Sequence, residues 1–353
     1  MRAFFAGQPQ LTPTPSVELT SLARDLALGS VRAKDESSRF GLNAFKLLGA
    51  RFAIETLVAR GQLSAGATVA CASEGNHGRA VARAARDAGC AARVYMARDA
   101  AQSRVDAIAG EGAAVVRVDG SYDDAVRILQ QESASHGWTI ISDTSWQDYE
   151  EIPRLIMLGY TRMMEEEVGD QGVGIGDQGV GIGDQGAGIR AFDAVFVQGG
   201  VGGLLCAVAS WCAFHQPQIK VIGVEPTDAA CLQASARAGR PVAVDGPLRT
   251  AMAGLRNREV SPLAFESLLP NVDAFIAIDD EWAFEAMRAL HRHGIAAGAS
   301  GSAALGGLLA LCQDPSMAPA REALGLGASA RVLAIVSEGA TDPALWSSAV
   351  AAR

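Results

Sequence analysis

Short apolar runs alternate along this chain with longer stretches of helical periodicity. Eight of these runs are expected to form strands, at 67–73, 92–97, 113–119, 138–142, 193–198, 219–225, 273–278 and 331–337. Continuous apolar strands separated by helices are typical of parallel sheets that helices cover on both faces. The pattern therefore predicts an α/β fold, in which ligands bind at the carboxyl ends of the strands.

One apolar stretch, residues 194–214, is about long enough to span a bilayer. Its first half contains Gly199, Gly200, Gly202 and Gly203, each of which costs a helix roughly 1 kcal/mol. No basic residues flank the stretch. We interpret it as a strand, a glycine loop and the start of a helix.

Composition narrows the class of protein. The chain has 353 residues, of which 49% are hydrophobic and 20% charged, so we expect a folded protein of two domains or one large body. A net charge of -9 argues against nucleic acid and anionic lipid as partners. The six cysteines show no CxxC pairing, and the N-terminal segment has too short an apolar patch for a secretory signal. We expect reduced thiols, no metal site and a cytoplasmic location.

A heptapeptide repeat covers residues 169–189, with three glycines in each unit of the pattern GDQGVGI. Glycines 174, 176 and 179 spell GxGxxG, but an acidic helix end precedes them rather than a strand, which disfavours dinucleotide binding. The aspartates of the repeat lack the period of calcium-binding β-rolls. We interpret the repeat as a flexible surface insertion.

Lysine usage supplies a candidate nucleophile. Lys34, Lys46 and Lys220 are the only lysines of the chain, and only Lys46 lies within an apolar helical pattern. A buried amine loses its charge more readily than an exposed one, as a Schiff-base nucleophile requires. Taken alone, Lys46 could equally be a snorkelling side chain.

Three predicted strands end in unusual loops, SEGNHG at 73–78, QGGVGG at 198–203 and SEGATD at 337–342. The first loop opens a helix, whose N–H groups form an anion site for a carboxylate or phosphate. Within it, His77 is either a catalytic base or a structural histidine at a helix start. The second loop either surrounds a phosphate monoester with backbone amides or is a tight packing turn.

Together these features resemble the fold type II pyridoxal-phosphate enzymes, the tryptophan synthase β-subunit group, and within that group diaminopropionate ammonia-lyase. The matching motifs stand in the family's order, namely RFGLNAFKLLGA (39–50), SEGNHGRAVA (73–82), SRVDAI (103–108), DTSWQDYEEIP (143–153), the loop at 198–203, TAMAGL (250–255) and SEGATD (337–342). The resemblance implies a large cofactor-binding domain from 1–50 and 190–353, a small domain from 51–168, the cofactor in the cleft between them, and a homodimer.

The resemblance also implies roles for individual residues. Lys46 would hold pyridoxal phosphate and act as a base at Cα, and Asp143 would engage the substrate's distal amine, unless it caps a helix beginning near Tyr149. The implied cofactor contacts are Asn76 for the phenolic oxygen, Gly199, Gly200, Val201, Gly202 and Gly203 for the phosphate, and Ser337 for the pyridine nitrogen. The implied substrate contacts are Ser73, Gly75, His77 and Asp143.

This sequence departs from the family pattern at three places. Glu74 stands where the family has a second catalytic Asp, Ala299 stands where an acidic residue is expected, and the repeat is inserted. If residue 74 serves the D-isomer and Lys46 the L-isomer from opposite faces of Cα, the longer Glu74 favours the L-isomer as substrate.

The implied reaction is α,β-elimination of 2,3-diaminopropionate to pyruvate and ammonia. A serine or threonine dehydratase shares this chemistry but lacks the FGLNAFK and DTSW segments, and a β-replacement synthase would use a second nucleophile. A non-catalytic pyridoxal-phosphate-binding protein is the alternative of another class, for which Glu74, Asp143 and Ser337 would be superfluous. A dinucleotide oxidoreductase would rest only on the repeat.

Overall fold

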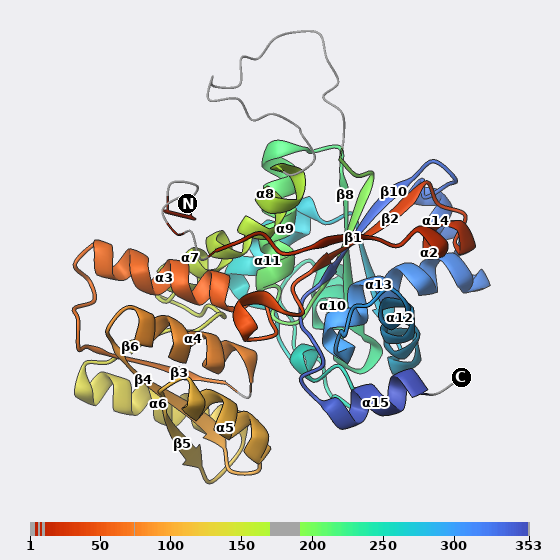
Figure 1. The fold of residues 1–353 in the computed structure, drawn as a ribbon. Helices are drawn as coiled ribbons and strands as arrows, with labels where there is room; N and C mark the ends of the chain where they lie inside the picture. Colours follow the sequence, from red (N-terminus) through yellow and green to blue (C-terminus); the bar gives the residue numbers. More distant parts are fainter. Residues whose placement is uncertain (1–3, 6–7, 9–10, 74, 170–190, 352–353) are drawn as a thin grey trace, which may run out of the picture. The chain divides into compact units, whose positions relative to one another are not determined.

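A computed structural model describes all residues except 1–3, 6–7, 9–10, 74, 170–190 and 352–353 (Figure 1). Glu74 therefore lies outside the described residues, and so does the repeat except for Gly169, the last residue of a helix. The described part divides into two compact units. We call residues 1–11 and 40–160 the small unit, and residues 12–39 and 161–353 the large unit.

The small unit is built on a parallel sheet with the strand order β5-β4-β3-β6. The strands are β3 (Thr68–Ala72), β4 (Ala91–Ala97), β5 (Ala114–Val118) and β6 (Thr139–Ile140). The helices are α3 (Leu47–Ala59), α4 (Asn76–Asp87), α5 (Gln102–Gly110), α6 (Tyr122–His136) and α7 (Glu151–Tyr160). Ala70, Tyr95 and Val118 on the sheet pack against Ala125 and Leu129 on α6, so burial of these apolar side chains joins the helix to the strands.

The small unit takes in residues 40–50, which the sequence analysis placed in the large domain. The reason is close packing of α3 on α7. A Cβ atom added to Gly49 on α3 would lie 2.5 Å from the Tyr160 ring and 2.7 Å from the Ile156 carbonyl oxygen on α7. Because Gly49 has no side chain, the backbones of α3 and α7 can approach closely here. This packing places the start of α3 in the small unit.

The large unit contains a mixed sheet with the order β1-β2-β10-β7-β8-β9, in which only the β1-β2 pair is antiparallel. Its strands are β1 (Ser16–Glu18), β2 (Ser30–Asp35), β7 (Ala194–Gln198), β8 (Lys220–Pro226), β9 (Ala274–Ile278) and β10 (Arg331–Val336). The α-helices are α2 (Thr20–Asp25), α8 (Arg162–Gly169), α9 (Gly203–His215), α10 (Cys231–Ala238), α11 (Pro262–Asn271), α12 (Asp280–Arg292), α13 (Ala299–Gln313), α14 (Ala318–Ala323) and α15 (Pro343–Ala351). The 3-10 turns are η1 (Arg39–Gly41), η2 (Thr227–Ala229), η3 (Ala253–Leu255) and η4 (Pro315–Met317).

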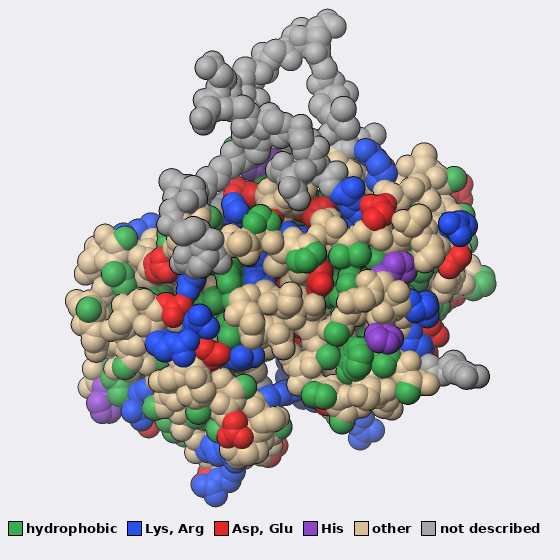
Figure 2. All heavy atoms as spheres, viewed as in Figure 1, with side chains coloured by type: hydrophobic (Ala, Val, Ile, Leu, Met, Phe, Trp, Pro, Cys, Tyr) green, Lys and Arg blue, Asp and Glu red, His purple; other side chains and the backbone are tan. Residues whose placement is uncertain are grey.

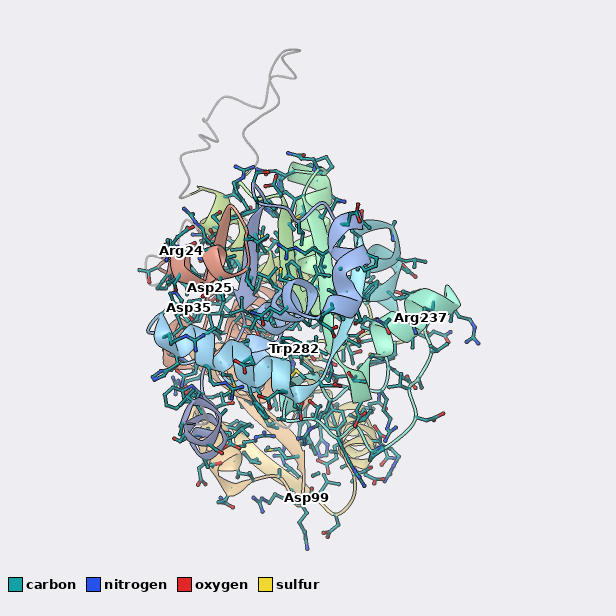
Figure 3. All side chains as sticks on the ribbon, turned by 90° about the vertical axis from the view of Figure 1, so that its right-hand side faces the viewer. Arg24, Asp25, Asp35, Asp99, Arg237 and Trp282 are labelled. Carbon is teal, nitrogen blue, oxygen red and sulfur yellow. The ribbon has the colours of Figure 1, made fainter. Side chains whose placement is uncertain are left out.

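The apolar core of the large unit lies between its sheet and the helices α12 and α13. Phe196, Val224 and Leu308 are buried within it, and Trp282 on α12 packs against it (Figure 3). On the face drawn in Figure 2, acidic and basic side chains are interspersed rather than gathered by sign. No helix in the described part of the chain is both long and apolar enough to cross a bilayer.

All eight strands expected from the sequence are present, and residues 194–214 form a strand, a loop and a helix as predicted. The sequence analysis missed β1 and β2. Strand β2 contains buried Lys34, and a buried ion cluster compensates its charge: Lys34 lies 3.1 Å from Glu166, which is also paired with Arg39. A charged residue at a core position interrupts the apolar pattern by which the other strands are recognised.

Candidate active site

Lys46 and Asp143 form an ion pair in the small unit. The Nζ atom of Lys46 donates a hydrogen bond to Oδ2 of Asp143 at 2.7 Å. Their side chains are 24% and 21% exposed, so both can be reached from solvent. Lys46 is the residue directly before α3, at its N-cap position, rather than a residue inside the helix.

The backbone before Lys46 is unusual. Phe40, Gly41 and Asn43 have φ values of 56°, 69° and 58°, a left-handed conformation that costs a side-chain-bearing residue roughly 1–2 kcal/mol. Arg79 on α4 donates to the carbonyl oxygens of Leu42 at 3.2 Å and Gly41 at 3.4 Å. These hydrogen bonds help to hold residues 40–43 in their strained conformation, and this segment positions the backbone of Lys46.

Two aromatic rings flank the amine of Lys46. Its Nζ atom lies 5.1 Å from the centroid of Phe45 and 5.7 Å from that of Tyr160, within cation–π range. Burial raises the pKa of Tyr160 well above its ordinary value. The sequence analysis missed Tyr160, because a single aromatic residue at the end of an apolar helix carries no signal that distinguishes it from core.

The loop between β3 and α4 closes on the Ser73 hydroxyl. The Oγ atom of Ser73 accepts hydrogen bonds from the N–H groups of Gly75 at 3.2 Å and Gly78 at 2.8 Å. A Cβ atom on Gly78 would lie 2.9 Å from Val94, so the helix start approaches the sheet closely. Asn76 is the first residue of α4. The loop thus has the strand, turn and helix-start geometry of an anion site.

His77 has the acidic partner that the sequence did not show. Its Nε2 atom lies 2.8 Å from the Ile141 carbonyl oxygen, and its Nδ1 atom lies 3.6 Å from Oδ2 of Asp143. Burial by itself raises the pKa of Asp143, but the charges of His77 and Lys46 outweigh it and hold this pKa well below its usual range. The alternative that Asp143 caps a helix is wrong, because α7 begins only at Glu151.

In the large unit, the loop between β7 and α9 forms a glycine cradle. Gly200 and Gly202 have φ values of 78° and 97°, and a Cβ atom on Gly199 would lie 2.7 Å from Glu225. Ser261 donates its N–H to the Val201 carbonyl oxygen at 2.9 Å. The first-turn amides of α9, which begins at Gly203, have no acceptor within the helix. The loop is therefore both a packing turn and a site that fits a phosphate.

Ser337 follows β10 in the same unit and is 4% exposed. Its Oγ atom accepts a hydrogen bond from Nε2 of Gln198, and this Nε2 atom also donates to the carbonyl oxygens of Ser300 and Gly301 at 3.3 Å each. Because the amide of Gln198 acts as the donor, the hydroxyl of Ser337 keeps its own hydrogen for another acceptor. Gln198 was not assigned a role from the sequence.

The predicted residues thus fall into two sets. The small unit brings together Lys46, His77 and Asp143, with Ser73, Gly75 and Asn76 on the neighbouring loop, and the large unit carries Gly199, Gly200, Val201, Gly202, Gly203 and Ser337. Lys34 is more deeply buried than Lys46, at 1% exposed, so burial alone does not distinguish the candidate nucleophile. Within the described ranges no cluster of three metal-ligating side chains occurs.

Comparison with known proteins shows the family of the chain. A family model described as pyridoxal-phosphate dependent enzyme matches residues 8–338. Diaminopropionate ammonia-lyase of Escherichia coli strain K12 is 36% identical over 94% of this chain and 85% of its own length. The chain belongs to this family of ammonia-lyases. The Salmonella typhimurium member is 33% identical over 98% of this chain and 89% of its own length.

Solved structures of the family confirm the fold type II architecture. The holo form of the Escherichia coli diaminopropionate ammonia-lyase has a TM-score of 0.87, with 34% identity over 99% of this chain and 90% of that one. The same enzyme in complex with an aminoacrylate-PLP azomethine reaction intermediate has a TM-score of 0.86, with 35% identity and the same coverage. Outside the family, an L-threonine dehydratase of Haemophilus influenzae is 30% identical over 75% of this chain and 46% of its own length.

Proposed function

We propose that this protein cleaves 2,3-diaminopropionate to pyruvate and ammonia by pyridoxal-phosphate-dependent α,β-elimination. The observation that carries the proposal is the Lys46–Asp143 pair, with Nζ and Oδ2 2.7 Å apart, in a chain of the ammonia-lyase family. The pair places an amine beside a carboxylate that remains ionised. Elimination of an amine needs a base at Cα and a group that handles the departing nitrogen, and the pair offers both.

The residues present fit pyridoxal phosphate. Lys46 would hold the cofactor aldehyde, Asn76 its phenolic oxygen, the amides of 199–203 its phosphate, and Ser337 its ring nitrogen. The glycine cradle admits no Cβ at Gly199 or Gly202 without contacts of 2.7 and 2.9 Å, as a backbone site for a phosphate requires. When bound, the cofactor supplies an electron sink for the electrons released at Cα.

Ser337 favours elimination over transamination. A hydroxyl donates to the ring nitrogen but does not enforce its protonation, as a carboxylate would. The resulting weaker sink disfavours return of a proton to the cofactor's own carbon. The hydrogen bond that Ser337 accepts from Gln198 orients the hydroxyl hydrogen away from Gln198, toward the ring position.

The chain's own residues then divide the remaining work. The amine of Lys46 takes the proton from Cα, and the hydroxyl of Ser73 with the start of α4 holds the substrate's carboxylate. The ionised carboxylate of Asp143 binds the ammonium group on Cβ. Ammonia leaves as a neutral molecule only if its nitrogen is protonated, so this contact favours the departing form.

An ammonia-release screen of the purified protein tests the proposal. We expect release from D- or L-2,3-diaminopropionate with pyruvate as co-product, and little from serine or threonine. Borohydride reduction and peptide mapping should place a pyridoxyl label on Lys46. Lys46→Ala should abolish turnover. Lys220→Ala, at a partly exposed site where the amine donates to the Ala323 carbonyl oxygen at 3.3 Å, should retain it.

Dehydration of serine or threonine is the second candidate, because the threonine dehydratase similarity covers most of this chain. Faster turnover of serine or threonine than of either diaminopropionate isomer would favour it. Cofactor binding without turnover of any of these amino acids would instead indicate a non-catalytic pyridoxal-phosphate-binding protein.

We also propose that the protein acts as a cytoplasmic homodimer with a small amino acid as its partner. All six cysteines are free thiols, which suits a reducing compartment. The dimer rests on resemblance to the family. Size-exclusion chromatography with light scattering measures the mass of the protein in solution. A mass near 36.6 kDa, that of one chain, would contradict the dimer.

A further inference from the structure

The two ring nitrogens of His77 have different surroundings. Nε2 lies 2.8 Å from the carbonyl oxygen of Ile141. A carbonyl oxygen only accepts hydrogen bonds, so Nε2 carries a hydrogen. A neutral imidazole has one N–H group, and in that form Nδ1 therefore holds a lone pair.

That lone pair would face a carboxylate. Nδ1 lies 3.6 Å from Oδ2 of Asp143, and among the described residues Nδ1 has no hydrogen-bond partner. His77 is only 7% exposed, so bulk water does not solvate the gap freely. Two electron-rich atoms in this position repel each other unless a proton lies on one of them. The geometry therefore favours a proton held by the His77–Asp143 pair.

The charged and titratable groups around the pair are few in the described part of the chain. Lys46 faces it from the start of α3, Cys71 from β3, Tyr149 from the loop before α7 and Tyr160 from α7. Burial raises the pKa of Cys71, Tyr149 and Tyr160, so these three stay neutral near pH 7. Of these four side chains, Lys46 is then the one that brings a charge to the pair.

Lys46 is placed to exchange protons with the pair. Its Nζ atom donates to the same Oδ2 atom of Asp143 that faces His77. Lys46 and His77 thus face the same carboxylate oxygen, Oδ2 of Asp143, at 2.7 Å and 3.6 Å.

We propose that His77 is a positioning residue that keeps this proton on the His77–Asp143 pair for delivery to the departing nitrogen. The inference rests on the proposed elimination of diaminopropionate. In the step, the β-nitrogen is the neutral amine. The bond between the shared proton and the pair, at Nδ1 of His77 or Oδ2 of Asp143, breaks as an N–H bond forms on the β-nitrogen. The Cβ–N bond then breaks, and its electron pair leaves with neutral ammonia. The proton that Lys46 removes from Cα then passes to Asp143 and restores the pair.

Leaving-group chemistry tests the proposal. Chloride leaves without a proton, whereas an amine requires one, so the wild type and His77→Gln are compared on L-2,3-diaminopropionate and β-chloro-L-alanine. Gln keeps an N–H donor for the Ile141 carbonyl oxygen, but its amide does not titrate near neutral pH and so cannot deliver a proton. His136→Gln, the same change at an exposed histidine, is the control and should match the wild type.

For His77→Gln we expect a fall in kcat of about 10²-fold on diaminopropionate, the lower range of general acid catalysis, with KM little changed and turnover of β-chloroalanine within about twofold. The loss should grow with pH, because at high pH the substrate arrives with a neutral β-amine and the enzyme must supply the proton. His77→Asn should show the same selectivity if His77→Gln does not fold, as checked by circular dichroism.

The outcomes separate the two proposals. An equal loss on both substrates would make His77 only structural, and unchanged turnover of diaminopropionate by the variant would show that no proton passes through His77. Either result overturns the inference while leaving the ammonia-lyase function in place. A wild type that turns over β-chloroalanine but not diaminopropionate would overturn the proposed function itself.

Discussion

Substitution of Gly202 by Ala tests whether the glycine cradle is constrained by both conformation and packing. Gly202 has φ of 97°, and an added Cβ would lie 2.9 Å from Leu268 and 3.2 Å from Ala264. The left-handed conformation costs Ala roughly 1–2 kcal/mol, and overpacking in a core costs typically ~1–3 kcal/mol. We therefore expect Gly202→Ala to lower the free energy of unfolding by about 2–5 kcal/mol.

Gly239→Ala is the matched control in the same unit. Gly239 also has a positive φ, of 66°, but nothing lies within 4 Å of its added Cβ. It should lose only the conformational part, roughly 1 kcal/mol. Urea unfolding of both variants and of the wild type, without cofactor, gives the two values, and their difference isolates the cost of packing against Leu268.

Cofactor binding completes this test. A ligand that binds only the folded state stabilises the wild type by about 2.7 kcal/mol at a hundred times its Kd. Gly202→Ala should lose most of this gain because the cradle shifts, whereas Gly239→Ala should keep it. Equal destabilisation by the two variants, or full cofactor stabilisation of Gly202→Ala, would refute the reasoning that this loop is a close-fitting phosphate site.

Three further changes have expected outcomes. Glu166→Gln removes the buried carboxylate that pairs with Lys34 and leaves Arg39 its pair with Glu36, and it should cost roughly 3–5 kcal/mol in urea unfolding. Because pairing lowers the pKa of Glu166 against the burial that raises it, the wild-type contribution should fade as pH falls through the folded pKa. An unchanged pH profile would contradict this. Burial raises the pKa of Glu225 from 4.5 to about 7, so between these pH values the native state binds a proton that the unfolded state has lost. The free energy of unfolding of the wild type should therefore fall by roughly 3 kcal/mol as pH rises from 4.5 to about 7. Glu225→Gln should remove this pH dependence. Ser337→Ala should leave the unfolding free energy within about 1 kcal/mol, since Gln198 keeps two carbonyl acceptors, but should reduce turnover; a variant as active as the wild type would exclude Ser337 as a cofactor ligand.

The strands that could be predicted from sequence are those whose side chains are buried on both faces of the sheet. Strands such as β7 and β10 lie within a parallel sheet, so nearly every residue is apolar and the run is visible. Glycines that break the run at 199–203 mark the loop that follows. Strand β2 was invisible because Lys34 and Asp35 are buried in it, and the carboxylate that pairs with Lys34 comes from a distant segment, at Glu166.

The candidate site divides in the same way. The sequence by itself determined the residue types and their local settings, because turns and helix starts depend on neighbouring residues. These settings are a lysine at the start of α3, a glycine-containing turn before α4 and before α9, and a serine at the end of β10. Only the tertiary structure decided that Asp143 lies against Lys46 and His77, that Tyr160 flanks the amine, and that Lys34 is neutralised by ion pairs. These pairings depend on Coulomb interactions and burial between segments far apart in the chain, and no local pattern records which distant charge a side chain will meet.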